Sequence, residues 1–300
     1  NNFNYNFIRI LLIYFFSTVF IIFLYSLSNI RLFDAFNLAF TVISSGGFVN
    51  SSNLNNILSN DFQIFILSIT LLIPILNFFL FYNFFIRRFE IKNHYEDVHL
   101  LGIVILLSLF LYFFIISNDG FAKVFLAVTS SIATSGLAME SFYHNTDLLF
   151  ILLTLIGGSL VSTTSGFKYV RFYILFKISY QEIYRLVKPI NIFNKNLFNN
   201  ESKINDEDAK IAFLVFISFI ALLFILSSIL TLDYLNFEEA FKLSMLTLTN
   251  TATSSMYGFE NLSFFDLNVF TKISLIIFMI FGKIEIIAVL FLLRKFIIKE

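Results

Sequence analysis

Thr129-Ser-Ser-Ile-Ala-Thr-Ser-Gly136 and Gly157-Gly-Ser-Leu-Val-Ser-Thr-Thr-Ser-Gly-Phe-Lys168 are the two stretches of sequence that decide the fold of this chain. Both are made mostly of small and hydroxylated residues, and both lie between strongly apolar segments. A lipid bilayer tolerates non-helical backbone only where that backbone is buried in protein or lines a watery cavity. Two such stretches in a membrane chain therefore predict a pore or a binding site.

The composition predicts a multi-span membrane protein. Of the 300 residues, 58% are hydrophobic and 13% are charged, and the mean hydropathy is +0.85. Soluble domains carry charge on roughly a quarter of their residues. The formal net charge is zero, which argues against nucleic acid as a partner, and the absence of cysteine excludes disulfides and thiolate metal sites.

Nothing in the sequence groups residues for catalysis. His94, His99 and His144 do not have a metal-ligand spacing, and the chain has no nucleophile elbow or nucleotide-binding loop. An intramembrane enzyme would have to use scattered carboxylates. We therefore predict that the chain is not an enzyme and binds no organic cofactor.

Six apolar segments are long enough to cross a bilayer, which takes roughly twenty residues in a helix. They lie near 7–29, 62–86, 99–117, 148–178, 210–232 and 267–298. Between the first and second, the third and fourth, and the fifth and sixth lies a shorter amphipathic segment that ends in small or hydroxylated residues. The predicted fold is all-α and integral to the membrane, with a unit of helix, half-helix and helix repeated three times.

The repeat keeps its internal offsets, as a true repeat must. A phenylalanine stands eleven residues before a small residue in each unit, and the pairs are Phe36 and Gly47, Phe125 and Gly136, and Phe241 and Ala252. We assign the units to 1–97, 98–187 and 210–300. The polar segment 188–209 is predicted to be a cytoplasmic linker, with a docking role as the alternative.

Basic residues set the orientation, because lysine and arginine gather on the cytoplasmic side of a membrane protein. Most of them fall on one side: Arg9, Arg87, Arg88, Lys92, Arg171, Lys177, Arg185, Lys188, Lys195, Lys203, Lys210, Arg294, Lys295 and Lys299. The side of the half-helices has only Arg31, Lys123, Lys242 and Lys272. The half-helices are therefore expected to enter from outside the cell.

A half-helix that enters from outside points its carbonyl end, with roughly half a negative charge, at the centre of the protein. Carbonyls and hydroxyls beyond that end can replace the water around a weakly hydrated cation. This predicts an ion filter made of Ser45, Gly46, Gly47, Thr134, Ser135, Gly136, Thr251, Ala252 and Thr253. The alternative is that small residues only let the helices pack closely. Asp34, Asp119, Glu238 and Glu239 are expected to cap the opposite ends.

The second opening stretch interrupts the fourth apolar segment with three glycines, five Ser or Thr residues and a lysine. A straight helix is not expected through that composition. We predict a mobile loop across the pore below the filter, with a bent but static helix as the alternative. The residues predicted to form this gate are Gly157, Gly158, Ser162, Thr163, Thr164, Ser165, Gly166 and Lys168.

Gly282-Lys-Ile-Glu285 places two charges within the last apolar segment. An ionisable residue inside a membrane is a functional candidate. Lys283 is predicted to act with the gate as a positive barrier near the ion path. The alternatives are that its side chain reaches the cytoplasmic surface, or that it pairs with Glu285.

These residues resemble the Trk/Ktr/HKT superfamily of potassium-uptake proteins, and within it the bacterial Trk-type membrane subunit most closely. Phe33-Asp-Ala-Phe36 through Gly46-Gly-Phe48 resembles the second repeat of that family. Gly157 to Lys168, with the basic helix that follows, resembles its third-repeat pattern Gly-Gly-x-x-Gly-Ser-Thr-Ala-Gly-Gly-Ile-Lys. Gly282-Lys-Ile-Glu285 resembles Gly-Arg-Leu-Glu of its final helix.

The resemblance implies four repeats around one pore, of which this sequence matches the last three, so we expect a longer protein with a first repeat upstream. It implies that Gly47 and Gly136 are filter glycines and that Lys283 takes the place of an arginine below the filter. The sequence departs from the family pattern at Ala252, Val161 and Ser165, where the family has glycine.

The resemblance further implies potassium uptake across the bacterial cytoplasmic membrane, a homodimer, and a separate cytosolic regulatory subunit that binds the nucleotide. Ala252 keeps open the alternative of sodium or mixed monovalent cations. A non-conducting membrane scaffold is the alternative from a different functional class.

Overall fold

The chain was analysed as a computed structural model, which describes residues 2–51, 53–86, 94–116, 120–139, 146–187, 197–198, 204–233, 235–259, 264 and 267–283. All regular structure in these residues is helical. Several residues used in the sequence predictions lie outside the described part of the chain: Arg87, Arg88, Lys92, Asp119, His144, Lys188, Lys195, Lys203, Glu285, Arg294, Lys295 and Lys299.

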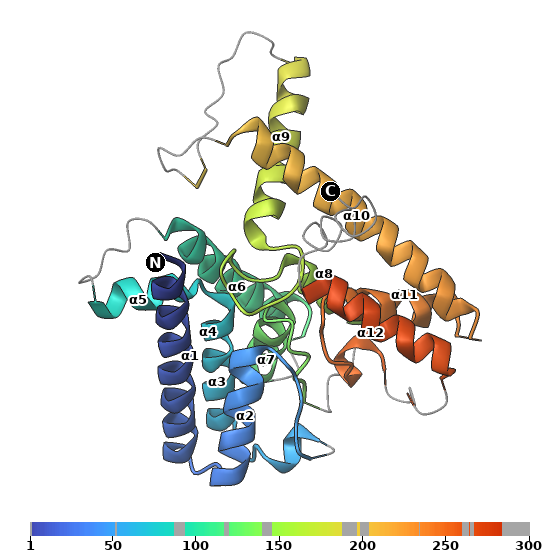
Figure 1. The fold of residues 1–300 in the computed structure, drawn as a ribbon. Helices are drawn as coiled ribbons and strands as arrows, with labels where there is room; N and C mark the ends of the chain where they lie inside the picture. Colours follow the sequence, from blue (N-terminus) through green and yellow to red (C-terminus); the bar gives the residue numbers. More distant parts are fainter. Residues whose placement is uncertain are drawn as a thin grey trace.

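The helices follow the order of the three predicted units (Figure 1). The first contains α1 (Asn2–Leu27), α2 (Leu32–Ser44), η1 (Leu54–Asn56), α3 (Asp61–Thr70), α4 (Leu72–Ile75) and α5 (Phe78–Ile86). The second contains α6 (Tyr95–Phe114), α7 (Phe121–Ile132), α8 (Asp147–Ile156) and α9 (Tyr169–Val187). The third contains α10 (Asp206–Thr231), α11 (Phe237–Leu248), η3 (Ser255–Tyr257) and α12 (Val269–Lys283).

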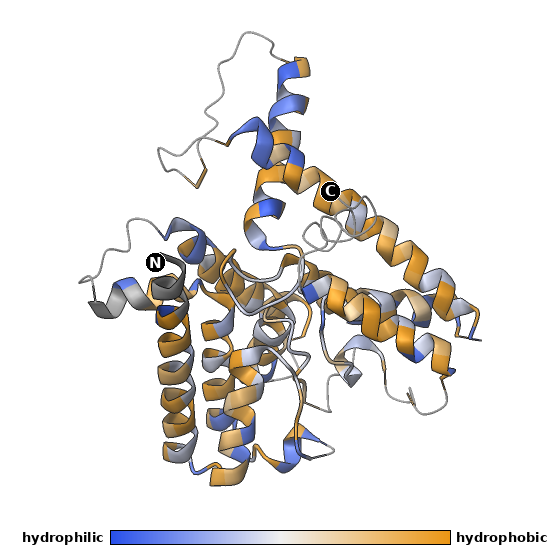
Figure 2. Ribbon diagram, in the orientation of Figure 1, coloured by the Kyte–Doolittle hydropathy of each residue, from blue (hydrophilic) through white to orange (hydrophobic). Residues whose placement is uncertain are grey.

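Among the described residues, three helices are long and apolar enough to cross a membrane unbroken: residues 8–27 of α1, α6 and α10. Their outward faces are apolar and exposed, as at Phe16, Phe113 and Phe213 (Figure 2). Water does not favour such surfaces, whereas lipid tails cover them at no cost. These faces are the expected lipid contacts of a membrane protein.

The half-helix α7 occupies the centre of the described fold. It packs against α3, α6 and α8, and every residue from Val124 to Ile132 is buried. Helices α2 and α11 are shorter than a bilayer is thick and pack within the first and third units. Unlike α7, α2 leaves one apolar face exposed at Phe36 and Phe40.

The second predicted span is not one helix. It is divided into α3, α4 and α5, and the backbone leaves the helical conformation at Leu76, where φ is −80° and ψ is 160°. Pro74 explains part of this break, because proline inside a helix removes a hydrogen bond and clashes with the preceding turn. Helix α5 then runs crosswise to α1 (Figure 1).

The fourth predicted span is interrupted where its composition indicated. Helix α8 ends at Ile156, α9 begins at Tyr169, and residues 157–168 form a loop without regular structure. Gly157 and Gly166 adopt positive φ values of 63° and 82°, which L side chains rarely allow. Helix α9 then extends upward in Figure 1, where it packs against α10 and contacts α6.

The third unit begins earlier than predicted. A capping box between Asn205 and Asp208 starts α10 at Asp206, four residues before the predicted boundary at 210. The sixth predicted span, 267–298, is described only as far as Lys283.

Candidate functional site

The three half-helices α2, α7 and α11 end in the same backbone arrangement. Each is followed by a left-handed residue, with φ values of 55° at Ser45, 53° at Thr134 and 51° at Asn250. The next residue donates its N–H to a carbonyl five residues back: Gly46 to Thr41 (2.8 Å), Ser135 to Ser130 (3.0 Å) and Thr251 to Leu246 (2.9 Å). This is the Schellman motif, here in three copies. The sequence repeat is therefore also a structural repeat in the same register.

Beyond these caps lie three short segments, 45–47, 134–136 and 251–253, which we call the turn segments. They meet one another directly. A Cβ atom added to Gly47 would overlap the carbonyl oxygen of Ser135, and one added to Gly136 would overlap the carbonyl oxygen of Ala252. Both glycines also have positive φ, 73° and 76°. Larger side chains at these two positions would force the segments apart.

Ala252 takes the equivalent place in the third unit without the same constraint. Its φ is not positive, so an alanine fits its backbone conformation. Its methyl group nevertheless points to the meeting place, 2.7 Å from the position that a Cβ of Gly47 would occupy. The third turn segment therefore differs from the other two in the size of the side chain at this position and in its backbone conformation.

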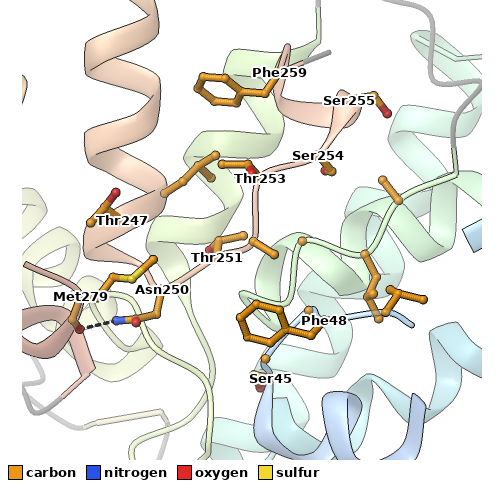
Figure 3. A pocket seen from close by; sticks show the side chains of 18 of the residues that line it. Ser45, Phe48, Thr247, Asn250, Thr251, Thr253, Ser254, Ser255, Phe259 and Met279 are labelled. Carbon is orange, nitrogen blue, oxygen red and sulfur yellow. Dashed lines mark hydrogen bonds between the residues drawn. The ribbon is translucent and has the colours of Figure 1, made fainter. Parts of the chain in front are cut away.

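The turn segments border a cavity of about 1270 Å³ (Figure 3). Residues 250–255 run along one side of it, and Ser45 and Phe48 lie across from them (Figure 3). Seven of the nine predicted filter residues line this cavity: Ser45, Gly46, Gly47, Gly136, Thr251, Ala252 and Thr253. Thr134 and Ser135 are instead wholly buried beside it.

Most hydroxyl groups of the turn segments are held by the protein itself. Thr134 Oγ1 accepts the N–H of Ser165 at 3.0 Å, and Ser135 Oγ lies 3.1 Å from Ser130 Oγ. Thr251 Oγ1 lies 2.9 Å from Thr249 Oγ1. These bonds fix the turns but leave those hydroxyls little capacity for a ligand.

The backbone carbonyls of the turn segments are different. Within the described part of the chain, none of the nine accepts a hydrogen bond from protein. Buried carbonyls normally have a partner, either in the protein or in solvent. The negative ends of three half-helices converge at the same place, and both features favour a cation.

The 157–168 loop contacts all three units. Thr163 Oγ1 donates to the carbonyl of Ile43 in the last turn of α2 at 2.8 Å. The carbonyl of Thr163 accepts a bond of 2.7 Å from Lys283 Nζ in α12. With the Ser165 to Thr134 bond, these contacts place the loop against the ends of two half-helices and against the last helix.

The loop is also closed on itself. Lys168 Nζ donates to the carbonyl of Thr164 at 2.6 Å and to Ser162 Oγ at 3.0 Å. Thr164 Oγ1 accepts the N–H of Gly158 at 2.8 Å. The first residues of the loop are thereby tied to its second half, and Lys168, 7% exposed, is held within the protein.

A second cavity, of about 390 Å³, lies beside this loop. It is lined by the predicted gate residues from Ser162 to Gly166, by Lys168 and by Lys283. Lys283 borders both cavities. The alternative pairing with Glu285 lies outside the described residues.

The acids predicted to cap the outer ends lie in the first turns of their half-helices where they are described, but neither helix has a side-chain cap hydrogen bond. Asp34 lies in the first turn of α2 and accepts Asn50 Nδ2 at 2.8 Å. Glu238 and Glu239 lie in the first turn of α11, and Glu238 pairs with Lys242 at 2.6 Å. Lys242 also pairs with Asp147 at the start of α8, which joins the second and third units.

Sequence reasoning missed a polar cluster at the start of α6. Glu96 Oε1 accepts the N–H of Leu160 in the loop at 3.0 Å, and Asp97 Oδ1 accepts the N–H of Asn77 at 2.9 Å. Asp97 also lies 3.2 Å from His94 Nδ1. Two acids in a first turn resemble ordinary helix caps, so nothing local in the sequence distinguishes them. No cluster of three or more metal-ligating side chains occurs among the described residues.

Repeated units of helix, half-helix and helix, apolar outer faces and an interrupted span are features of a multi-pass membrane protein. Over about nine tenths of its length the chain is similar to Trk-type potassium-uptake proteins. The predicted family resemblance and membrane location are thereby confirmed.

Two relatives illustrate this similarity. The chain is 29% identical over 287 residues to the Trk system potassium uptake protein TrkG of Escherichia coli, covering 91% of this chain and 58% of that protein. It is 29% identical over 275 residues to TrkH of Salmonella typhimurium, covering 87% of this chain and 56% of the relative. The chain thus spans less than two thirds of the length of these relatives. No family model matches it.

The fold is that of a solved transporter. The crystal structure of the potassium transporter TrkH from Vibrio parahaemolyticus superposes with a TM-score of 0.83 at 23% sequence identity. The match covers 92% of this chain and 61% of that one. The prediction of an all-α membrane fold is confirmed at this level.

Proposed function

We propose that this protein takes up potassium ions across the cytoplasmic membrane. The ion passes the nine backbone carbonyls of the turn segments, and the 157–168 loop below them is the gate. The observation that carries this proposal is the convergence of three negative half-helix ends on carbonyls that accept no hydrogen bond in the described structure. The names of the relatives support potassium as the ion.

Potassium suits such a site because it is weakly hydrated and exchanges its water for carbonyl oxygens at little cost. The hydroxyls of Thr134, Ser135 and Thr251 hold the turns in place rather than binding the ion. Three units supply three sides of the path. A fourth unit, as the resemblance implies, closes the remaining side next to the larger cavity.

Within this proposal, Lys168 and Lys283 act at the gate. Lys168 holds the loop closed on itself, while Lys283 binds the Thr163 carbonyl next to both cavities. A positive charge close to a cation path raises the electrostatic barrier there. Lys283 is bound to the Thr163 carbonyl of the loop. If the loop moves, the positive charge of Lys283 would move away from the ion path and the electrostatic barrier would fall.

A second candidate function is the uptake of sodium or of mixed monovalent cations. It is favoured by the Ala252 methyl group, which points to the place where the other two turn segments have glycine. Selectivity between potassium and sodium depends on the number and placement of carbonyls. A turn segment of different shape would weaken it.

The last part of the proposal concerns assembly. As the resemblance implies, the protein forms a homodimer and binds a cytosolic regulatory subunit, which carries the nucleotide-binding site. Helix α9 supports this part. Its exposed residues Phe176, Tyr180, Ile183 and Val187 follow one another at helical spacing and form an apolar stripe. An exposed apolar stripe of this kind favours a partner with an apolar surface.

The proposed function is tested by potassium-limited growth of an uptake-deficient bacterium that carries the complete gene. Wild type should restore growth. Gly136→Asp should not, because its side chain would collide with the Ala252 carbonyl. Gly102→Ala is the matched control, since a Cβ at Gly102 meets nothing within 4 Å. Growth rescue by Gly136→Asp, with the protein shown to be in the membrane, would contradict the filter assignment.

A further inference from the structure

The 157–168 loop is held on two sides, and the proposed function accounts for only one of them. On the side of the turn segments, Thr163 and Ser165 bind Ile43 and Thr134. On the other side, residues 159–161 dock against the break between α4 and α5 and against the start of α6. The second set of contacts joins residues more than sixty positions apart in the sequence.

Three consecutive loop residues each make one bond on this second side. The N–H of Ser159 donates to the carbonyl of Ile75 at 2.9 Å, and the carbonyl of Val161 accepts the N–H of Phe78 at 3.0 Å. Between them, the N–H of Leu160 donates to Glu96 Oε1 at 3.0 Å. The break frees the Ile75 carbonyl and the Phe78 N–H from helical pairing, so the loop uses groups that an unbroken helix would not offer.

The break is itself held by the residue that follows Glu96. Asp97, 1% exposed, accepts the N–H of Asn77 at 2.9 Å and lies 3.2 Å from His94. His94 Nε2 in turn lies 3.0 Å from Asn83 Nδ2 of α5. This network joins α5 to the start of α6, and so fixes the groups that the loop binds.

We infer that Glu96 and Asp97 are positioning residues for the gate, Glu96 by binding Leu160 directly and Asp97 by holding the helix break on which Ser159 and Val161 dock. This inference rests on the proposed gating role of the loop. The loop contains Gly157, Gly158 and Gly166, whose backbones are conformationally free. Ordering the loop therefore costs conformational entropy, which the hydrogen bonds at residues 159–161 offset. The bond from Thr163 to Ile43 does not replace these anchors, because it lies on the side of the turn segments.

The inference is tested by the reactivity of a single cysteine, because the chain has none of its own. Ser165→Cys is the reporter: Ser165 is 3% exposed, and its hydroxyl makes no hydrogen bond in the described structure. Ser68→Cys in α3, also wholly buried, is the control reporter. The full-length purified protein is treated with a water-soluble maleimide, and the rate of modification is followed.

Glu96→Ala and Asp97→Ala should each speed modification of Ser165→Cys by about tenfold, the effect of losing one charge-assisted hydrogen bond. Glu96→Gln and Asp97→Asn keep an acceptor oxygen and should stay within about twofold of the parent. Ser68→Cys should remain unreactive throughout. Unchanged reactivity of Ser165→Cys in both alanine variants would overturn the inference, and so would an equal rise at Ser68→Cys, which would indicate general loosening.

The thiol measurement does not depend on transport. Potassium flux into liposomes is measured on the same variants, and both alanine variants should change the flux while both amide variants restore it. If the wild type carries no potassium but the thiol rates change as expected, the proposed function fails and the loop anchoring stands. If the wild type transports and the thiol rates do not change, the anchoring fails alone.

Discussion

At the scale of single residues, the turn segments depend on two glycines that have no space for a side chain. Gly47 and Gly136 have positive φ and no room for a Cβ, since each faces a carbonyl of the neighbouring segment. Ala252 differs because its φ is not positive. The spacing of these residues could be predicted from the sequence, and so could the interruption at 157–168. The backbone of Ala252 could not, because alanine permits several conformations.

Ala252→Gly should increase the preference for potassium over sodium. Removing the methyl group gives the third turn segment the same freedom as the other two and lets its carbonyls approach the path equally. We expect a several-fold rise in the ratio of potassium to sodium flux in liposomes. Ala209→Gly, in the first turn of α10, controls for the general effect of a new glycine. An unchanged ratio would show that Ala252 does not set selectivity.

Lys242→Met should destabilise the protein by about 2 kcal/mol, because it leaves the partly buried Asp147 without its ion-pair partner. The pair joins α8 to α11, so the loss is expected in the packing between two units. Arg185→Met is the matched control: its pair with Glu182 is more than half exposed and should contribute almost nothing. Thermal unfolding in detergent measures both, and equal midpoints for the two variants would contradict the assignment.

At the scale of elements, the half-helices and the loop show why part of the site was hidden from sequence reasoning. The caps of α2, α7 and α11 use bonds that span five residues, so a local pattern reveals them. The break after α4 had a local signal in Pro74 and Asn77, but an apolar run of that length also suits one span. The Glu96 to Leu160 contact spans 64 positions and has no local signal.

Thr163→Val should loosen the loop without changing its shape. The valine keeps the branched side chain but cannot donate to the Ile43 carbonyl at the end of α2, a bond typically worth about 1 kcal/mol. We expect potassium flux to rise several-fold, because the loop leaves the closed position more often. Thr231→Val provides the control, since that hydroxyl binds only its own helix. A flux equal to the wild type in both variants would argue against Thr163 as part of the closed state.

At the scale of the whole molecule, the three units surround one cavity with equivalent elements at equivalent places. The half-helices bring their carbonyl ends together, the apolar faces of α1, α6 and α10 point outward, and the loop that interrupts the fourth predicted span lines the smaller cavity. The repeated pattern in the sequence predicts this plan, and the all-α membrane fold is the part of it that the superposition on a solved structure confirms. The way the loop rests on all three units required the structure.

The central claim is that the carbonyls of the turn segments conduct the ion, and potassium flux into liposomes containing the purified protein tests it most directly. The wild type and Gly102→Ala should carry potassium at similar rates, because a methyl group at Gly102 has open space. Gly136→Ala should reduce the flux by at least about tenfold, because its methyl group would displace the Ala252 carbonyl. Equal flux in all three proteins would contradict the claim and move the ion path away from the turn segments.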